Sequence, residues 1–383
     1  MKSIVIIFAL LLFGQQELKA QLVPYRFSEK WGYCDTAGNI VIEPRFQLAD
    51  FFESNMAFVK IDTMYYGINK KGEVITEAFK QYGRFKEGLC PVTTHKGKAY
   101  FINEEGKNPF GKIFSAAENF SEGRAIVSMQ KKLGIIDTKG AWVREPGFDS
   151  SSIYYKSGFL LAKDKGRFFY IDKKGKTLEL AENIQPAGIF SEGLAGVYVK
   201  SQILENNTIR TFYNLQFIDS TGKVVLSNFF YEGINYADYI NYEKEFKDGK
   251  AIINVPSDMA YKRFFINKKG EFSEEFSYAQ HLSDSMYLGV IGFMLPSIRF
   301  YDSMFFTKGE FDMPITSVGI FGNKLVPVQN KAGYWGYCNK YADVIIPFIY
   351  ESAEQFVNGF AIVKKNGRMG VINTYGKEFF REY

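Results

Sequence analysis

The sequence predicts an all-β protein, organised as a repeat array of about ten units of about 34 residues, each with about three short antiparallel strands. First, residues 30–59 return almost intact as residues 334–363. Second, a turn signal, Asp or Asn followed three residues later by Gly, recurs along the chain. Third, the chain holds 38 Phe and 25 Tyr among 383 residues, and aromatic side chains favour strands. We favour an open, curved β-array, with a closed β-propeller as the alternative.

The first strand of each unit ends at an Asp or Asn. The ten positions are Asp35, Asn69, Asn103, Asp137, Asp172, Asp219, Asn267, Asp302, Asn339 and Asn373. Asp or Asn at the first corner and Gly at the fourth is typical of a type I turn, so each position predicts a strand reversal. The residue before it is apolar in every unit, as Cys34, Ile68 and Cys338 illustrate, and is expected in the core.

The rest of each unit supplies a second strand, a connector and a third strand. Pro44, Pro146 and Pro347 close some of the second strands, because proline cannot donate to a continuing ladder. The connectors carry apolar residues at every third position, which predicts one turn of 3₁₀ or α-helix. A polar residue followed by Gly, as in Glu122-Gly123, opens the third strand.

The repeats divide the chain into four parts. We expect a signal peptide over residues 1–20, regular repeats over 21–180, divergent repeats with insertions over 181–324, and regular repeats over 325–383. Insertions fall near residues 201–210 and 228–245. Insertions in repeat proteins often map to the binding face, so these segments are the most individual part of the chain.

The two ends bear on whether the array is open or closed. Residues 22–25 look like a third strand without its own first two, and the final copy stops after its second strand. An N-terminal strand that completes the last unit would seal a closed ring, although an open stack would have the same ends. Ten units exceed the usual four to eight blades of a propeller, which favours the open array.

The N-terminus predicts export. Lys2 precedes an apolar run over residues 4–13, and Lys19-Ala20 precede the expected cleavage site near Ala20. The run is too short to span a membrane, and no later segment has the length of a transmembrane helix. We therefore expect a secreted or periplasmic protein. The three cysteines, Cys34, Cys90 and Cys338, are expected to be small buried core residues rather than a disulfide framework.

The units resemble a known family. Lys30-Trp31-Gly32-Tyr33, Tyr334-Trp335-Gly336-Tyr337 and the Leu133-Gly134 pair, each with its turn and a strand that ends in proline, are similar to the WG-repeat (KWG) family. The resemblance covers essentially all of residues 21–383. It implies a secreted or envelope bacterial protein of β-repeats with no established general activity and no catalytic residue to carry over.

The sequence offers little catalytic chemistry. Cys90 lies near His95, but no third residue orients a base, and His281 lies far away in the divergent region. His and Cys show no metal-ligand spacing, and the glycines lie in turns, so we expect no metal and no cofactor. The alternative is a glycan-active enzyme with acids in the divergent region, namely Asp284, Asp302, Glu310 and Asp312.

Four inserted tyrosines are the candidate binding residues: Tyr231, Tyr236, Tyr239 and Tyr242. Tyrosine is enriched at interfaces, although these four would equally suit the core of a stretched unit. The net charge of +5 comes from interspersed charges and gives no reason to expect nucleic acid. The sequence thus predicts a non-catalytic, monomeric scaffold for a protein or a cell-envelope glycan, with a purely structural array as a further alternative.

Overall fold

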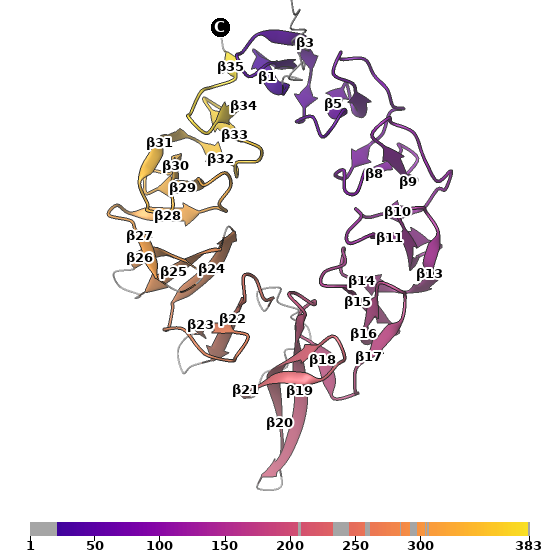
Figure 1. Cartoon of the computed structure of the whole chain (residues 1–383), viewed down its shortest axis with the longest axis vertical. Coiled ribbons are helices and arrows are strands. Elements are labelled where there is room, and N and C mark those ends of the chain that lie inside the picture. Colours follow the sequence, from indigo (N-terminus) through magenta and orange to yellow (C-terminus); the bar gives the residue numbers. More distant parts are fainter. Residues whose placement is uncertain are drawn as a thin grey trace, which may run out of the picture.

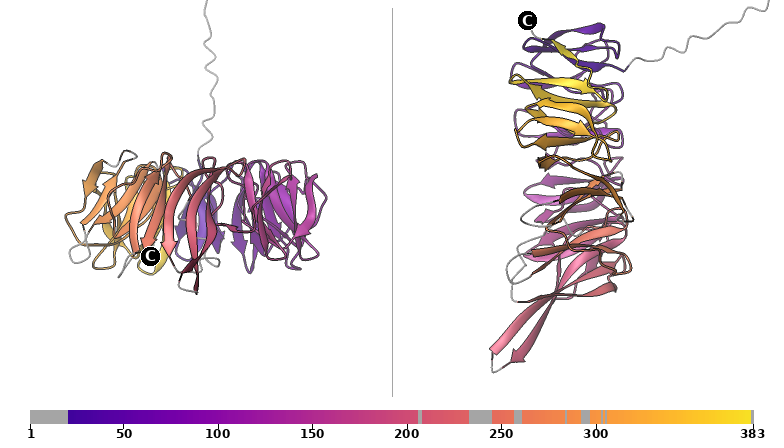
Figure 2. Two further views of the ribbon diagram at one scale, coloured as in Figure 1. Left: turned by 90° about the horizontal axis from the view of Figure 1, so that it is seen from below. Right: turned by 90° about the vertical axis from the view of Figure 1, so that its left-hand side faces the viewer.

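The computed structural model describes residues 21–205, 208–232, 245–256, 261–283, 285–291, 297–302, 304 and 306–381. In this part of the chain every regular element is a strand, and the strands form ten small sheets. The sheets follow one another round an oval ring with an open middle (Figure 1), and the ring is a flat disc in side view (Figure 2). The expected signal peptide, residues 1–20, lies outside the described residues.

The sheets are numbered here in ring order. Sheet 1 joins β35 (Phe380–Arg381), β1 (Val23–Phe27), β2 (Lys30–Cys34) and β3 (Ile40–Phe46). Sheet 2 holds β4 (Leu48–Ala49), β5 (Ala57–Ile61) and β6 (Met64–Ile68). Sheet 3 holds β7 (Gln81–Tyr82), β8 (Leu89–Thr93) and β9 (Ala99–Asn103). Sheet 4 holds β10 (Ala116–Ala117), β11 (Arg124–Met129), β12 (Lys132–Asp137) and β13 (Trp142–Phe148). Sheet 5 holds β14 (Ser150–Ser151), β15 (Phe159–Asp164), β16 (Arg167–Asp172) and β17 (Thr177–Glu179).

The other half of the ring is built in the same way. Sheet 6 holds β18 (Ile184–Pro186), β19 (Leu194–Glu205), β20 (Thr208–Asp219) and β21 (Val224–Glu232). Sheet 7 holds β22 (Lys250–Pro256) and β23 (Tyr261–Asn267). Sheet 8 holds β24 (Tyr278–Ser283), β25 (Met286–Ile291), β26 (Ser297–Tyr301) and β27 (Thr307–Glu310). Sheet 9 holds β28 (Ile315–Val318), β29 (Val326–Asn330), β30 (Trp335–Cys338) and β31 (Val344–Tyr350). Sheet 10 holds β32 (Ser352–Ala353), β33 (Phe360–Lys365) and β34 (Arg368–Asn373).

The predicted all-β array of about ten repeats is confirmed, including the unit at Asp302. The repeat in the sequence is offset from the sheet in space. The Asp or Asn turn joins the last two strands of a sheet, whereas the connector and third strand of the same repeat begin the next sheet. Each repeat therefore belongs to two sheets, which ties neighbouring sheets together through the backbone.

The two ends of the array meet. In β1, Arg26 pairs with Phe380 of β35 in parallel register, whereas every other strand pairing in the described part of the chain is antiparallel. Residues 23–27 thus lie where the third strand of the final repeat would stand. Of the two arrangements that the sequence allows, the structure has the closed ring. Ten units exceed the usual number of propeller blades, which favours an open array, but the pairing of β1 with β35 joins the two ends.

The Asp and Asn turns form as predicted. The Oδ1 atom of Asp35 accepts hydrogen bonds from the backbone N–H groups of Gly38 and Asn39, both at 2.8 Å. Asp302 does the same for Met304 and Phe306. The apolar residues that precede the ten turns are all buried. The repeated acids are therefore turn caps, as expected.

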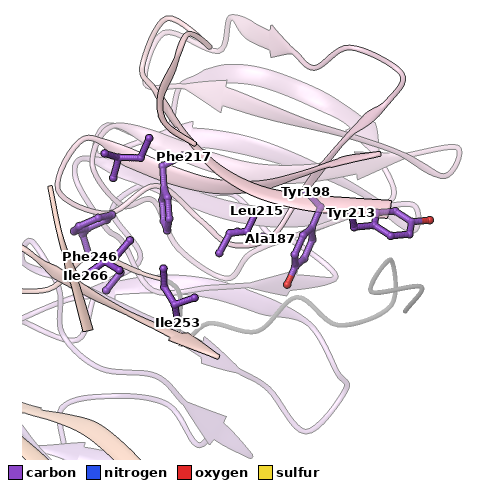
Figure 3. Close-up of a cluster of buried hydrophobic side chains, with 10 residues drawn as sticks. Ala187, Tyr198, Tyr213, Leu215, Phe217, Phe246, Ile253 and Ile266 are labelled. Atoms are coloured by element: carbon purple, nitrogen blue, oxygen red, sulfur yellow. The ribbon is translucent and has the colours of Figure 1, made fainter. Parts of the chain in front are cut away.

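The core is divided among the interfaces between sheets. Ten clusters of buried side chains occur among the described residues, and each cluster joins two successive sheets. Figure 3 shows the cluster between sheets 6 and 7, where Phe217 and Phe246 meet edge to face at 5.1 Å. Central strands such as β11 carry consecutive buried residues, because both faces of each sheet are covered.

The connectors differ from their prediction. The described connectors contain no helical turn, and several instead form two-residue strands such as β4, β7 and β10. Phe46, Phe79 and Phe114, which head three connectors, are buried between sheets. Apolar residues at every third position are typical of a 3₁₀ turn. In these connectors the same spacing has another cause, because the chain passes from one sheet to the next.

Hydrogen bonds also join neighbouring sheets through the tight turns that precede the third strands of the repeats. Glu122 has a positive φ of 52°, and its carboxylate accepts a hydrogen bond from the N–H group of Gly158 in the next sheet at 2.8 Å. Equivalent pairs recur around the ring: Glu87 with Gly123, Glu192 with Gly249, and Asn323 with Gly359. The polar residue of the motif therefore links sheets.

The first insertion lengthens one hairpin. β19 and β20 pair over twelve residues each and extend beyond the ring (Figures 1 and 2). Leu204 and Ile209, paired near the tip, are 69% and 64% exposed. Of the second insertion, residues 233–244 lie outside the described part.

Candidate binding cleft

A cleft of about 1100 Å³ lies among sheets 10, 1, 2 and 3. The short first strand of a sheet faces the middle of the ring, as β10 and β14 do in Figure 1, while β13 and β17 face outward. Residues in and around three such strands line the cleft, so it opens on the inner wall. The lining comprises residues 47–53 and 80–85, with Pro24, Trp31, Met56, Phe58, Tyr65, Asn119, Glu354, Gln355, Val357, Asn358, Phe360, Ala361, Ile362, Met369 and Val371.

Asp50 is held by hydrogen bonds with three neighbours in the cleft. Its backbone N–H donates to the carbonyl of Phe58 at 2.9 Å, and its carbonyl accepts from the Tyr33 hydroxyl at 2.8 Å. The Tyr82 hydroxyl, from the next sheet, donates to Asp50 Oδ2 at 2.5 Å. The position and orientation of this carboxylate are therefore set by three neighbours.

The surroundings of Asp50 alter its protonation. Burial raises the pKa of its carboxyl group above the usual range, and the Tyr82 hydrogen bond opposes that rise. The charge of Glu53 raises the same pKa further, whereas the charge of Arg84 lowers it. Titratable groups with shifted pKa values cluster at functional sites, which makes Asp50 a candidate.

Aromatic rings form one wall of the cleft. The ring centroids of Phe58 and Tyr82 lie 4.2 Å apart, and the Phe85 ring stacks on Phe58 at 5.8 Å with an interplanar angle of 4°. Tyr65 meets the edge of Tyr82 at 5.0 Å. These contacts hold the rings in fixed orientations, so the wall is formed before any ligand arrives.

Polar and charged side chains line the rest. Glu53 accepts a hydrogen bond from the backbone N–H of Phe85 at 3.1 Å, and Asn119 accepts one from the N–H of Arg84 at 2.8 Å. The side chains of Gln81, Arg84 and Glu354 are exposed. The cleft thus combines aromatic faces, amide groups and a fixed carboxylate, which is the make-up of a small-ligand site.

The tyrosines predicted from sequence are placed only in part. Tyr231 belongs to β21, where its backbone pairs with Tyr213 of β20. Tyr236, Tyr239 and Tyr242 lie outside the described residues. The binding role of these four tyrosines stays a prediction.

Two of the acids proposed for a glycan-active enzyme, Asp302 and Glu310, form ion pairs with neighbouring cationic side chains, and Asp302 also caps a turn. Asp302 forms an ion pair with Lys308 at 2.9 Å, and Glu310 forms one with Arg299 at 3.0 Å. Hydrogen bonds from Ser297 and Arg299 hold the pKa of the Glu310 carboxyl group below its usual range. Burial raises the pKa of Asp302, but hydrogen bonds from Lys308 and from the backbone N–H groups of Phe306 and Met304 outweigh it, so that pKa is also lowered. Asp312 is exposed, and Asp284 lies outside the described residues.

The histidines and cysteines have structural surroundings. Cys34, Cys90 and Cys338 are free and buried, as expected, and burial raises the pKa of the Cys90 thiol to about 12. His95 is exposed on a loop. His281 contacts Asp248 at 2.7 Å.

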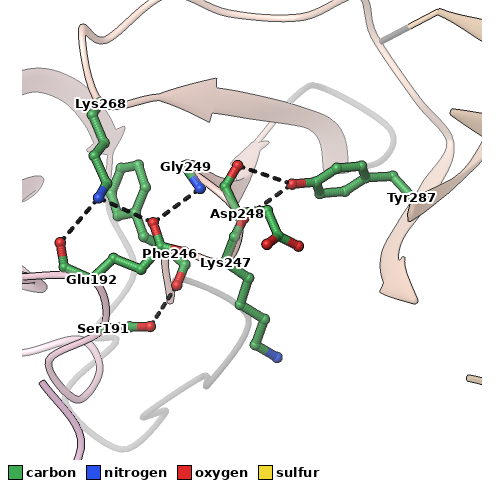
Figure 4. A network of polar contacts seen from close by, with 8 residues as sticks. All are labelled: Ser191, Glu192, Phe246, Lys247, Asp248, Gly249, Lys268 and Tyr287. Atoms are coloured by element: carbon green, nitrogen blue, oxygen red, sulfur yellow. Dashed lines mark hydrogen bonds and ion pairs between the residues drawn. The ribbon is translucent and has the colours of Figure 1, made fainter. Parts of the chain in front are cut away.

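A polar network joins sheets 6, 7 and 8 around Asp248 (Figure 4). The Tyr287 hydroxyl donates to the carbonyl of Lys247 at 3.0 Å, and Lys268 forms an ion pair with Glu192 at 3.1 Å. The contact of His281 with Asp248 adds a further link between sheets 8 and 7. This network connects sheets in the divergent region.

The described ranges bear on metal binding and on membrane crossing. No group of three or more His, Cys, Asp or Glu side chains there is placed to hold a metal ion. None of these residues forms a helix of the length and apolarity that crossing a bilayer requires.

The sequence did not single out Asp50, Glu53 and Tyr82. Asp50 and Tyr82 come from different repeats, 32 residues apart, and meet only because successive sheets pack together. The acid directly before Phe51 and Phe52 was a weak signal, because the same position holds Gly83 in the following repeat but Glu118 and Glu354 in two others.

Comparisons with known proteins concern the repeats and the overall fold. The family model described as "WG containing repeat" matches residues 31–65, 68–98, 101–132 and 335–368. No curated protein matches the sequence. A solved eukaryotic initiation factor is similar at 10% identity and a TM-score of 0.44, over 94% of each chain. The computationally designed Ika8 protein is similar at 10% identity and a TM-score of 0.39, over 92% of this chain and 99% of that one. BamB from Moraxella catarrhalis is similar at 10% identity and a TM-score of 0.36, over 86% and 91%.

Proposed function

Because the chain belongs to the WG-repeat family, we propose that it is a non-catalytic binding scaffold that holds a protein or a cell-envelope glycan in the cleft of its ring. It acts as a secreted or periplasmic monomer, after cleavage near Ala20. The export part of the proposal rests on the charged, apolar and small-residue pattern of residues 1–20.

The cleft is the observation that carries the proposal. It combines a volume of about 1100 Å³ with a preformed aromatic wall and a carboxylate fixed by Tyr82. Preformed clefts with a few convergent polar groups are the usual sites of ligand binding. The rings of Phe58, Tyr82 and Phe85 lose little freedom on binding because they already pack on one another, which favours affinity.

A second candidate is a glycan-active enzyme, and the raised pKa of Asp50 favours it. A carboxyl group with a raised pKa is better suited to act as a general acid, and glycosidases pair such a group with a second carboxylate. Glu53, whose charge contributes to the raised pKa, would be that second group. Substrate turnover separates this candidate from a scaffold.

The test is capture of ligands by the purified chain over residues 21–383, using defined envelope glycans and isolated envelope proteins. Gln81 is exposed and lines the cleft, so Gln81→Trp fills the cleft with bulk. Tyr375, 91% exposed on a turn of sheet 10, gives the matched control Tyr375→Ala. We expect Gln81→Trp to weaken capture at least tenfold and Tyr375→Ala to preserve it.

Two results would overturn the proposal. Equal capture by the parent chain and by Gln81→Trp would remove the cleft from the binding site. Release of a shortened glycan that stops on Asp50→Asn would establish the enzyme instead.

A further inference from the structure

We propose that the cleft recognises an oligosaccharide that carries a free, protonated amino group, and that the carboxylate of Asp50 receives that group. This inference rests on the proposed binding function and names the ligand class of the same cleft. The repeat fold does not require an acid at this position, because the equivalent residue is Gly83 or Gly188 in two connectors and Glu118 or Glu354 in two others. The hydrogen bond from Tyr82 to the carboxylate of Asp50 is the contact on which the inference rests.

Asp50 is built to receive a donor from the cleft. Its backbone is fixed on both sides, by the carbonyl of Phe58 and the hydroxyl of Tyr33. Tyr82 donates to Oδ2, and the contacts described for the carboxylate give Oδ1 no donor from the protein. A ligand amine at Oδ1 would therefore add a charge-assisted hydrogen bond without displacing Tyr82.

The aromatic wall suits the same ligand. Tyr82 donates to this carboxylate, and its half-buried ring and that of Phe85 both pack on the buried Phe58, which fixes their orientations. An aromatic face attracts a cation when the cation is removed from water, and a flat ring also covers the apolar face of a sugar. A carboxylate next to such a wall favours an organic cation over a neutral or anionic ligand.

The polar lining favours a saccharide over an extended peptide. A peptide that binds by strand addition needs a long free edge, whereas the first strands in the cleft, β4 and β7, have two residues each. The lining instead offers side-chain amides, including those of Gln81 and Gln355. Amides both donate and accept, which matches the hydroxyl groups of a sugar chain.

The surroundings of Asp50 disfavour two other ligands, a metal ion and an anion. Among the described residues no group of three metal-ligating side chains exists, so a metal ion lacks the ligands it would need. Glu53 adds a second negative charge near Asp50, which disfavours an anionic ligand such as a uronate or a phosphate. Arg84 and Lys80 are exposed and remain in contact with water.

The experiment compares four soluble ligands by calorimetry with the purified chain over residues 21–383: a glucosamine tetramer, its fully N-acetylated form, a neutral glucose tetramer and tetralysine. We expect the glucosamine tetramer to bind at least tenfold more tightly than each of the other three. Asp50→Asn should lose that preference, and Tyr375→Ala should keep it. Circular dichroism verifies that each variant is folded.

Acid provides a second readout. The groups that set the protonation of Asp50 are Tyr82, Glu53 and Arg84, with the Tyr33 hydroxyl on its backbone carbonyl. Binding of the amine should weaken as the pH falls through the raised pKa of Asp50, while any binding of the N-acetylated form should not follow that pH dependence.

The remaining outcomes separate this inference from the proposed function. If the free and N-acetylated tetramers bind with equal affinity and Gln81→Trp binds neither, recognition of the amino group is wrong. The proposed function as a glycan-binding scaffold is then still supported. If tetralysine binds most tightly, the assignment of an oligosaccharide ligand is wrong and a protein partner is indicated. Failure of all four ligands overturns the inference, while the capture experiment with Gln81→Trp still decides the function.

Discussion

The glycine of the Trp-Gly pair is required by a close approach of two backbones. A Cβ atom on Gly32 would lie 2.2 Å from the carbonyl oxygen of Ile42, and one on Gly336 would lie 2.6 Å from that of Ile346. Both contacts fall where the pairing register shifts, just before Pro44 and Pro347 in the outer strand. The glycine therefore leaves room for a bulge in the neighbouring strand, and the proline lies in that neighbouring strand next to the bulge.

We predict that Gly336→Ala destabilises the protein by about 1–3 kcal/mol, because the added methyl group meets backbone atoms that cannot move aside. Gly188→Ala is the matched control, since a Cβ there meets nothing within 4 Å. Denaturant unfolding measures both variants, and the control should stay within about 0.5 kcal/mol of the parent. Equal losses in the two variants would contradict the explanation.

We predict that Asp50→Asn stabilises the protein near neutral pH. Burial raises the folded-state pKa of Asp50 above the unfolded value of about 3.9. The native state then binds the proton more tightly, so stability is present below the unfolded pKa and is lost as the pH rises towards the folded pKa. Asparagine keeps an acceptor for Tyr82 and carries no charge.

Thermal unfolding as a function of pH tests this prediction. Near pH 7 the Asp50→Asn variant should melt about 2–4 °C above the parent. The two curves should converge below about pH 3.9, where both forms of the side chain are neutral. A lower melting temperature for the variant at pH 7 would mean that the charged carboxylate stabilises the fold. A gain in stability with a loss of binding is the pattern expected of a functional residue.

At the scale of elements, the long hairpin of sheet 6 is separable from the ring. Beyond the pair of Ser201 with Phe212, the strands continue to a tip where Leu204 and Ile209 are largely exposed. The buried cluster of the same sheet lies nearer the ring, around Tyr198 and Leu215. The outer half of the hairpin thus adds little to the core.

We predict that replacing residues 202–211 by an Asn-Gly turn leaves the fold intact, because Asn-Gly suits a two-residue hairpin and the buried cluster of this sheet draws on none of the side chains that the structure describes in that segment. The melting temperature should change by less than about 2 °C. Ligand capture through the cleft should be unaffected. Capture that disappears with the hairpin would move the binding site from the cleft to this element.

Some elements of this fold could be predicted from the sequence and others could not. Strand ends were predictable because Asp35 and its equivalents cap turns by local hydrogen bonds, which depend on neighbouring residues alone. The structure of the connectors was not predictable, since the spacing of Phe46, Ala49 and Phe52 suits a helical turn as well as it suits the extended connector that the protein has. The cleft escaped prediction because Asp50 and Tyr82 lie in separate repeats, in the regular region rather than the divergent one.

At the scale of the molecule, ring closure depends on a seam between sheets 10 and 1. Val23 and Tyr25 pack against Phe360 and Phe379 across this seam. The buried Arg26 side chain donates to the carbonyl of Met369, and its guanidinium lies 5.7 Å from the centroid of the Phe380 ring. The seam therefore has its own apolar core and its own polar contact.

We predict that Phe379→Ala opens the seam before the rest of the ring. The ring of Phe379 is buried in the seam cluster, and removing such a side chain costs about 3–5 kcal/mol. Hydrogen exchange should accelerate first at the amides of β1 and β34. Phe120→Ala, a buried phenylalanine between sheets 3 and 4, is the control and should leave these amides protected. Retained protection of β1 in Phe379→Ala would refute the role of the seam.

Because β1 and β35 meet, the sheets follow the sequence in a closed circle, and the residue at which the chain starts does not decide which sheets are neighbours. Every sheet has two neighbours, so the position at which the backbone is interrupted is one choice among several. A circular permutant, with its ends linked across the seam and a new break at the exposed turn near Gly222, would keep the same neighbours for every sheet. Selection on such a chain acts on adjacent pairs of repeats, and a repeat can diverge freely as long as the two beside it diverge to match.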